Sequence, residues 1–488
     1  MSAFEKNGIT KNMMNSVTFG RRELSTRYEE DDLNQQVVGE IIENILPLHI
    51  DNVNEINYLK GYYKGRQDIF GKVKNVRPEI NNMIVENNAY HIVEFKKGYV
   101  FGDPIQYVQR SDTEKEELDL FNQYMYQNAK ASKDKDLAED MYVAGVGYRI
   151  VLPKDKLPFG LYNLDNTNAF VVYSNNIEKT KLIGGFLTQL SEDTYKCMCY
   201  TRDVVYTYTI EYKKRSKNTV VVTFNSSVPN PLKKIPIVEY RLNKSRLGIV
   251  ELVKSMLDTL NFITSSDIDD IEQFVQSLLV FVNQDIDKKT LIELLEIGAL
   301  QIMSNDPKKP ADVKILTNKM SHSETKVLYD RIYVNMLTIA GVPKMSDKAS
   351  GGDTGQANLI GEGWTMADER AKQDELAFKE SEKEIIELAL DICKVKTSSK
   401  IKTLGLSDIE IKFTRNRSDN MLVKTQALMN LQSAQVAPEV AFTVIGLFSD
   451  PNEVVTQSKL YYGESFWKQD GKEEGVENAV DVVQQEQV

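Results

Sequence analysis

The distribution of apolar residues in the second half of the chain predicts two long helices separated by a polar segment. In the first, apolar residues recur at intervals of four, four and three, which puts them on one face of a helix over residues 321–341. These residues are Leu328, Ile332, Met336 and Ile339. Pro343 is expected to limit this helix, because its ring fixes φ and disfavours the α region for the residue before it.

Helix-compatible sequence resumes near Thr354 and continues to about Lys396, which predicts a second helix of roughly 60 Å at about 1.5 Å per residue. Gly361 and Gly363 near its start are expected to weaken or bend it. The segment between the two helices, KMSDKASGGD, contains one large apolar residue, Met345. From shape alone, this arrangement also fits a helical hairpin that caps a core.

The N-terminal half begins with further helical patterns. Apolar residues over 33–46 predict a helix closed by Pro47, and EINYLKGYYKG predicts a second one. Residues 80–97 are expected to form a third helix that Gly98 stops. Its partly inward residues are Ile84, Tyr90 and Val93. Residues 114–145 predict more helix.

From Gly147 the apolar period changes to two. Short β-branched and aromatic runs, separated by turn residues, predict a meandering antiparallel sheet. Cys197 and Cys199 fall on one strand and, by alternation, on one face of it. They could be half of a metal site or two small apolar residues. The second interpretation is favoured, because the chain has no second pair of Cys or His to complete tetrahedral ligation.

A further apolar stripe begins at about Arg246 and continues towards Phe274, which predicts another long helix. Its apolar face consists of Val250, Val253, Leu257 and Leu260. Residues 275–319 read as short strands around one small helix. After residue 397 an extended run, LSDIEIKFTRNR, precedes two or three short helices, and the polar sequence beyond Trp467 is expected to be disordered. Helices and sheets together predict an α+β fold class.

Composition and charge narrow the possible functions. The 488 residues suffice for two to four domains. Sixty basic and 71 acidic residues give a formal net charge of −11, so any contact with DNA is expected to be loose. Three cysteines do not make a disulfide framework, which favours a reducing cytoplasm. The N-terminal sequence MSAFEKNGITKNMMNSVTF has no apolar h-region, so we expect no signal peptide. Nowhere do 18 apolar residues run together, so we expect no membrane span.

The sequence offers little for catalysis. It contains no GxxxxGK[ST], HExxH or GxSxG motif. Its three histidines, His49, His91 and His322, each lie in or beside a helical pattern without a neighbouring Cys or His, which favours structural or solvent-facing roles. Acidic clusters are numerous enough that no catalytic carboxylate pair stands out. We therefore predict no enzyme activity, no cofactor and no metal site.

Four blocks of sequence, taken together and in this order, resemble the portal proteins of tailed bacteriophages, in the branch common among phages of Gram-positive hosts. They are FGDPIQY at 101–107, KIPIVEYRLNKSRLGIVELVKSMLDTLN at 234–261, DVKILT at 312–317 and IAGVPKMSDKASGGDTGQA at 339–357. The resemblance extends from about Tyr58 to Asp450.

The resemblance implies a mainly helical portal fold with a β-rich wing, two stem helices, a small α/β clip, a very long helix and a helical crown. In chain order it implies the wing (31–243), a stem helix (244–274), the clip (275–319), a second stem helix (320–342), a tunnel loop (343–354), a long wing helix (355–397) and the crown (398–467). The polar composition of the two ends adds a mobile N-terminal arm (1–30) and a disordered tail (468–488).

The same resemblance implies a function without catalysis. The chain would form a dodecameric ring at the unique capsid vertex of the virion, after assembly in the host cytoplasm and without contact to a membrane. Double-stranded DNA would pass through the ring during packaging and ejection. The ring would dock the terminase large subunit and the head-completion adaptor, contact the major capsid and scaffolding proteins, and nucleate capsid assembly.

The tunnel loop is the candidate site of DNA contact. Its lysines supply a modest positive charge, its serines can meet phosphate oxygens, and its glycines give freedom in φ. Such contacts follow the DNA backbone without reading bases. The candidate residues are Lys344, Ser346, Lys348, Ser350, Gly351, Gly352 and Asp353. The alternative is an ordinary surface loop that joins two helices.

Two other classes of protein compete with the portal interpretation. One is an intracellular α+β hydrolase with an unrecognised active site. The other is a scaffold, without a channel, whose long helix forms a coiled coil. Gly361, Gly363 and the irregular apolar spacing argue against the coiled coil, because strict heptads would be needed.

Overall fold

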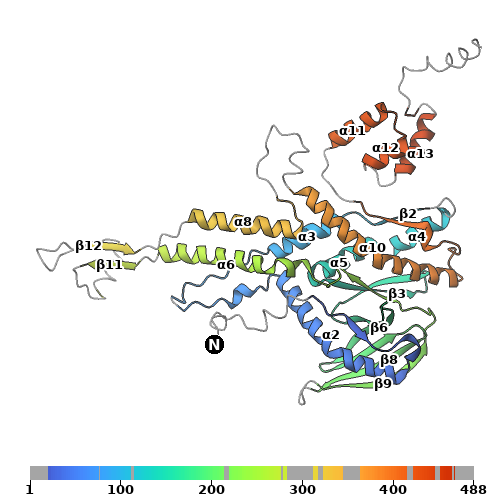
Figure 1. Cartoon of the computed structure of the whole chain (residues 1–488), viewed down its shortest axis with the longest axis horizontal. Coiled ribbons are helices and arrows are strands. Elements are labelled where there is room, and N and C mark those ends of the chain that lie inside the picture. The colour runs from blue at the N-terminus through green and yellow to red at the C-terminus, as the bar shows by residue number, and fades with distance from the viewer. Residues whose placement is uncertain are drawn as a thin grey trace, which may run out of the picture. The chain divides into compact units, whose positions relative to one another are not determined.

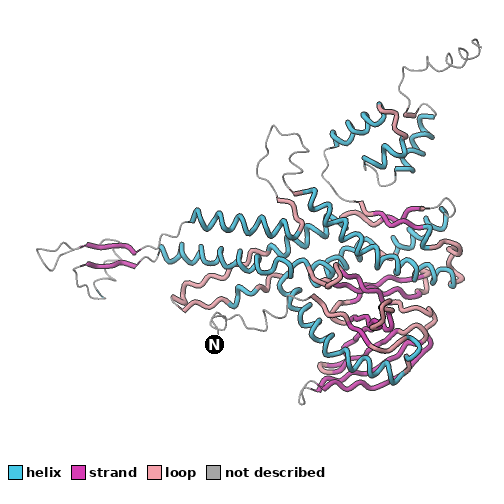
Figure 2. Tube along the Cα trace, viewed as in Figure 1, coloured by secondary structure: helices cyan, strands magenta, loops and turns pink. Residues whose placement is uncertain are grey.

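The computed structural model describes residues 20–75, 77–110, 115–213, 219–275, 278–282, 289, 312–316, 322–344, 363–414, 421–445, 451–463 and 466–467. The chain divides into two compact units, Met1–Phe413 and Thr414–Val488. The first unit combines long helices with several sheets (Figures 1 and 2), which confirms the predicted α+β class.

The helices of the first unit are α2 (Gln35–Tyr63), α3 (Asn88–Phe101), α4 (Lys115–Gln127), α5 (Lys130–Ala144), α6 (Ile249–Val275), α8 (His322–Ala340) and α10 (Trp364–Val395), with the short 3-10 helices η2 (Glu30–Asp32), η3 (Asp68–Gly71) and η4 (Leu406–Asp408). Its strands are β1 (Leu24–Thr26), β2 (Gln106–Gln109), β3 (Val146–Pro153), β4 (Phe159–Leu164), β5 (Ala169–Ser174), β6 (Lys181–Ser191), β7 (Thr194–Tyr200), β8 (Val204–Lys213), β9 (Thr219–Pro229), β10 (Ile237–Arg241), β11 (Leu278–Val282), β12 (Asp312–Leu316) and β13 (Ile409–Lys412).

The predicted antiparallel meander is present as strands β5 to β9, which follow one another in a six-stranded sheet of order β1-β5-β6-β7-β8-β9. Strands β3, β4 and β10 form a separate sheet of order β10-β3-β4. Local periodicity identified most of these strands but could not assign them to two sheets, because pairing joins residues far apart in sequence, such as Ile237 and Ile150.

The prediction that Pro47 ends a helix is wrong, because α2 continues through it. Proline removes one intrahelical hydrogen bond, at a cost of about 3 kcal/mol in a helix interior. The apolar face of α2 packs on the six-stranded sheet (Figure 1), and its buried residues continue beyond the proline to His49, Ile56 and Leu59. Burial of side chains on both sides of Pro47 therefore outweighs the lost hydrogen bond.

The prediction of a helix over 80–97 is wrong at both ends. Residues 81–87 are not helical, and α3 passes through Gly98 to Phe101. The non-helical residues are held along α6 instead: Ile84 N–H donates to Ser265 Oγ at 2.9 Å, and Glu86 N–H donates to Asn261 Oδ1 at 2.8 Å. These long-range hydrogen bonds compete with the local helical ones, and a local pattern cannot reveal them.

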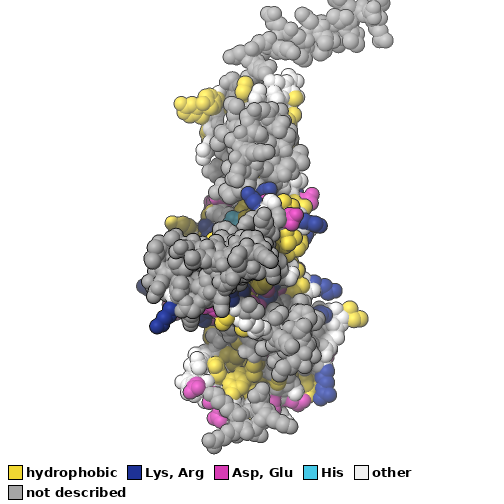
Figure 3. Space-filling model, turned by 90° about the vertical axis from the view of Figure 1, so that its left-hand side faces the viewer, with side chains coloured by type: hydrophobic (Ala, Val, Ile, Leu, Met, Phe, Trp, Pro, Cys, Tyr) yellow, Lys and Arg dark blue, Asp and Glu magenta, His cyan; other side chains and the backbone are white. Residues whose placement is uncertain are grey.

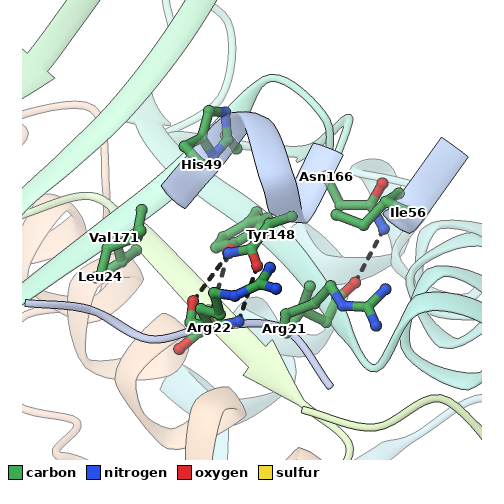
Figure 4. A pocket seen from close by; sticks show the side chains of 12 residues that line it. Arg21, Arg22, Leu24, His49, Ile56, Tyr148, Asn166 and Val171 are labelled. Atoms are coloured by element: carbon green, nitrogen blue, oxygen red, sulfur yellow. Dashed lines mark hydrogen bonds between the residues drawn. The ribbon is translucent and has the colours of Figure 1, made fainter. Parts of the chain in front are cut away.

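The N-terminal residues from Gly20 to Thr26, which the sequence analysis grouped with a mobile arm, are part of the fold. Strand β1 pairs in parallel with β5. The buried Arg21 guanidinium lies 2.5 Å from Glu251 Oε1 and 3.2 Å from Glu55 Oε2, so it joins α6 to α2. Figure 4 shows the neighbouring cavity, whose volume of about 10 Å³ suits at most one water molecule.

Helices α6 and α8 lie side by side (Figures 1 and 2). The predicted buried face of α6 is confirmed, because all four of its apolar residues are at most 1% exposed. The predicted face of α8 is partly wrong: Leu328 is 50% and Ile339 40% exposed, whereas Leu337 and Ala340 are buried with Met336. Periodicity correctly indicated a helix, but the side it buries depends on where its neighbours lie.

Four buried charges hold α10 against the sheet β10-β3-β4. Arg149 on β3 and Lys130 on α5 both contact Asp134 and Glu382, at 2.5 to 3.5 Å. The hydroxyl groups of Tyr107 and Tyr240 donate to Glu382 at 2.7 and 2.6 Å. The four charged side chains are at most 5% exposed, and their formal charges cancel.

Part of the predicted clip and crown lies among the described residues. Strands β11 and β12, which lie between α6 and α8 in the sequence, form an antiparallel pair. Of the small helix expected within 275–319, only Lys289 is among the described residues. Residues 398–413, which the sequence analysis grouped with the crown, belong to the first unit, where β13 pairs with β2. The second unit contains the expected short helices α11 (Met421–Ser433), α12 (Pro438–Ile445) and α13 (Pro451–Tyr462).

Candidate functional site

The structure describes one of the seven predicted site residues. Lys344 is exposed at the end of the segment that follows α8. The others, Ser346, Lys348, Ser350, Gly351, Gly352 and Asp353, lie outside the described residues. The structure therefore describes the residues on either side of segment 345–362. We call the end of α8 with Lys344 and the start of α10 with Gly363 the segment base.

Helix α8 ends in a glycine cap that the sequence analysis missed. Gly341 has φ +69°, its N–H donates to Thr338 O, and the N–H of Val342 donates to Leu337 O. This pair of hydrogen bonds is a Schellman motif, which satisfies carbonyl groups that a helix end leaves free. The glycine before Pro343 was the available signal, since glycine is the preferred residue at this position.

Helix α10 begins at Trp364, directly after Gly363, which adopts φ +84°. The helix predicted from near Thr354 is described from Trp364 onwards, with the left-handed Gly363 directly before its first residue, and its predicted start lies outside the described residues. A Cβ atom built on Gly363 would lie 3.8 Å from the Cα atom of Pro343. Pro343 and Gly363, which lie on either side of segment 345–362 in the sequence, are therefore close together in space.

A hollow of about 130 Å³ lies between the end of α8 and the start of α10. It is lined mainly by apolar groups, with the exposed Lys344 among them. The lining residues are Val334, Leu337, Thr338, Gly341, Val342, Lys344, Gly363 and Met366. Lys344 and Gly363, the described residues on either side of segment 345–362, thus line one hollow.

The first turns of α10 are anchored on α3. The Trp364 ring contacts the rings of Phe95 and Tyr99, with centroids 6.0 and 5.9 Å apart. The Tyr99 hydroxyl donates a hydrogen bond to Asp368. Further along the helix, Asp374 forms an ion pair with the buried Lys96 at 3.0 Å. This side of the base is therefore rigid.

Helix α8 is anchored by residues that precede α3. The carboxylate of Glu86 accepts hydrogen bonds from Tyr329 on α8 and, at 2.7 Å, from Thr264 on α6. Burial and the bond to Glu86 raise the pKa of Tyr329, which keeps this hydroxyl protonated as a donor. One carboxylate thus connects both long helices.

Arg370 is a residue of this base that the sequence analysis missed. A Cβ atom built on Gly341 would lie 2.7 Å from Arg370 Cγ and 3.0 Å from its Cβ. The exposed arginine therefore covers the turn at the end of α8. No local pattern connects Gly341 with Arg370, because the contact arises from the placement of α10 beside α8.

The remaining candidate chemistry is structural in character. Cys197 and Cys199 are free, buried cysteines on β7 with their sulfur atoms 3.4 Å apart. The hydrogen bond to Cys197, together with burial, raises the pKa of the Cys199 thiol. Among the described residues, no three or more His, Cys, Asp or Glu side chains are grouped so as to hold a metal ion. In the same residues, no helix combines the length and apolar character needed to cross a bilayer.

Charge is mixed on one face of the molecule. On the face shown in Figure 3, Lys and Arg side chains alternate with Asp and Glu side chains, and no broad area of one sign is visible among the coloured atoms. Tight binding of a polyanion requires many clustered cations, and the coloured atoms of this face show no such cluster.

Comparison with known proteins decides the family. Residues 42–461 match the family described as phage portal protein, SPP1 Gp6-like. The chain belongs to the phage portal protein family. This confirms the resemblance seen in its sequence blocks, and members of the family are structural rather than catalytic proteins.

A curated relative agrees with the assignment. This portal-family chain is 23% identical over 264 residues to the portal protein of Bacillus phage SPP1. The alignment covers 48% of the chain and 51% of the relative. The chain thus spans about half the length of the curated relative that it matches.

Proposed function

We propose that this portal-family chain assembles into a closed dodecameric ring at one vertex of the capsid, and that double-stranded DNA passes along the axis of the ring. The observation that carries the proposal is the helix pair α6 and α8, which has the β11–β12 pair between its members in sequence and the base of segment 345–362 at its opposite end. A ring of such pairs would present twelve segments to one axis.

The electrostatics support passage without tight binding. With a net charge of −11 for each chain, the assembled ring repels a duplex from its wall more than it attracts it. Low attraction keeps friction low while DNA slides. The few cations at the segment base would then provide weak contacts that follow the backbone without reading bases.

The partners follow from the same proposal. Strands β11 and β12 lie in the region proposed as the clip, where the terminase large subunit docks during packaging and the head-completion adaptor docks afterwards. The wing, built around the six-stranded sheet, would contact the major capsid and scaffolding proteins during assembly in the host cytoplasm.

Microscopy of the purified full-length chain tests the proposal. Negative-stain images are expected to show rings of about twelve subunits, and light scattering should give the corresponding mass. The axial hole must be wide enough for duplex DNA. A chain that stays monomeric or dimeric under all assembly conditions, or a ring closed along its axis, contradicts the proposal, and turnover of a small substrate by the single chain would favour the hydrolase alternative.

Reversing the charge of the candidate loop should reduce DNA packaging without affecting the ring. In the double variant Lys344→Glu and Lys348→Glu, four units of negative charge are added to each chain's net charge, so the loops repel phosphate. Deleting residues 346–352 should have a similar effect. The DNA content of particles and the fraction of assembled rings are the measurements.

The matched control is Lys383→Glu with Lys400→Glu, two exposed lysines outside the segment base. It makes the same change in net charge and should package normally. Normal packaging by both loop variants would remove the loop from the mechanism.

A further inference from the structure

We propose that Arg370 and Lys344 together form a phosphate-binding site for double-stranded DNA at the base of segment 345–362. This inference rests on the proposed function, and it deepens it by assigning a DNA contact to α10 itself, outside the predicted loop. The site would receive the DNA backbone and would be indifferent to base sequence.

Geometry brings the two cations to one turn. The aliphatic stem of Arg370 covers Gly341, since a Cβ atom on that glycine would meet Arg370 Cγ at 2.7 Å. Lys344 follows Gly341 by three residues, and both line the same hollow. Two positive side chains from different parts of the chain therefore border the point where the chain leaves α8.

Neither charge is paired within the part of the chain that the structure describes. Both side chains are exposed, and among the residues that the structure describes neither has a carboxylate oxygen within ion-pair distance. The nearby Lys96, by contrast, is buried and neutralised by Asp374. A guanidinium group presents a planar fork of donors that matches two phosphate oxygens, so Arg370 is suited to this ligand.

The anchoring of α10 makes the site rigid. Trp364 and Asp368 hold the helix to α3 before Arg370, and Asp374 holds it one turn afterwards. A cation carried on a fixed helix loses less conformational entropy on binding than one on a free loop. Arg370 would thus be the fixed member of the site.

A structural role for Arg370 must be separated from DNA binding. Its positive charge also lies near the C-terminal end of α8, where the helix dipole favours cations. Arg370→Gln keeps most of the aliphatic part of the side chain over Gly341 but removes the charge. Arg370→Lys keeps the charge but lacks the planar set of donors of the guanidinium group. Thermal unfolding of each variant reports the structural role, and DNA binding reports the proposed one.

The experiment measures binding of random-sequence duplex DNA to the purified full-length protein as a function of salt. For Arg370→Gln and Lys344→Gln, the slope of log affinity against log salt should fall by about 0.9 for each phosphate that the variant no longer neutralises. Arg370→Lys should retain most of the slope. Lys383→Gln, an exposed lysine further along α10, serves as the control and should leave the slope unchanged.

The outcomes separate this inference from the proposed function. If wild-type rings package DNA but Arg370→Gln has the wild-type slope, the site is wrong and the portal function stands. If no ring forms, yet both site variants lower the slope and the control does not, the site stands and the ring proposal fails. An equal effect of Lys383→Gln, or a reduced slope that only accompanies a lower unfolding temperature, overturns the site.

Discussion

Replacing Glu382 by alanine is expected to destabilise the first unit by about 3–5 kcal/mol. Glu382 is fully buried. It forms ion pairs with Lys130 and Arg149 and accepts hydrogen bonds from two tyrosine hydroxyl groups. Its removal would leave two buried cations with Asp134 as their one remaining carboxylate partner in the cluster. An uncompensated buried charge and two orphaned hydroxyl groups are among the most costly defects in a protein interior.

The free energy of unfolding can be obtained from urea denaturation followed by circular dichroism. Glu387→Ala is the matched control, because Glu387 lies on the same helix but pairs with Lys234 at the surface, with both side chains 42–51% exposed. Exposed pairs contribute about 0–1 kcal/mol. Equal effects of the two substitutions would show that the buried cluster does not stabilise the fold.

The lowered pKa of Glu382 predicts that the protein loses stability in acid. Burial alone would raise the pKa of Glu382, but Lys130, Arg149 and the two tyrosine hydroxyls lower it below the usual value of 4.5. A lowered pKa in the folded state stabilises the protein above pH 4.5, and this contribution is lost as the pH falls through the folded pKa. Glu382→Ala should therefore show a weaker dependence of unfolding free energy on pH below 4.5 than the wild type.

Replacing Gly145 by alanine is expected to cost about 2–5 kcal/mol, from left-handed backbone strain of about 1–2 kcal/mol and overpacking of about 1–3 kcal/mol. Gly145 ends α5 with φ +79°. A Cβ atom there would lie 2.1 Å from the carbonyl oxygen of Arg246. The backbone that leads into α6 passes so close to this glycine that no side chain fits between them.

Gly98→Ala is the control, and it is expected to stabilise the protein instead. Gly98 lies inside α3, and a Cβ atom there would meet nothing within 4 Å. Alanine should stabilise the helix by about 1 kcal/mol, because glycine is the poorer helix former. Thermal unfolding of both variants gives the comparison. A Gly145→Ala protein that melts at or above the wild-type temperature would refute the close approach.

These two features bear on the proposal that a rigid body makes transient contacts with DNA. Glu382 fixes α10 to the sheet, and Gly145 allows α5 to pack directly on the entry to α6. The two helices that border the proposed DNA site therefore rest on a stable core. Helix α10 contacts this core directly, and α8 is held to it by the neighbouring α6. Under this proposal, contacts with DNA would be made and broken at the segment base without disturbing the wing.

Local sequence determined the secondary structure wherever periodicity and packing agreed. The stripe at Val250, Val253, Leu257 and Leu260 predicted the buried face of α6, and period-two runs predicted strands β5 to β9. The four sequence blocks were also enough to indicate the family. In each case the signal lies within a few residues, where helix and strand geometry act directly on neighbouring side chains.

The tertiary structure decided everything that depends on distant partners. Pro47 stays inside α2 because distant residues bury both halves of that helix, the six-stranded sheet before the proline and two other core clusters around Ile56 and Leu59 after it. Residues 81–87 leave the helical pattern because α6 binds their backbone. Arg370 meets Gly341 only once α10 lies beside α8. A local pattern cannot contain such contacts, because their free energy comes from packing and hydrogen bonds between residues that the chain brings together only when it folds.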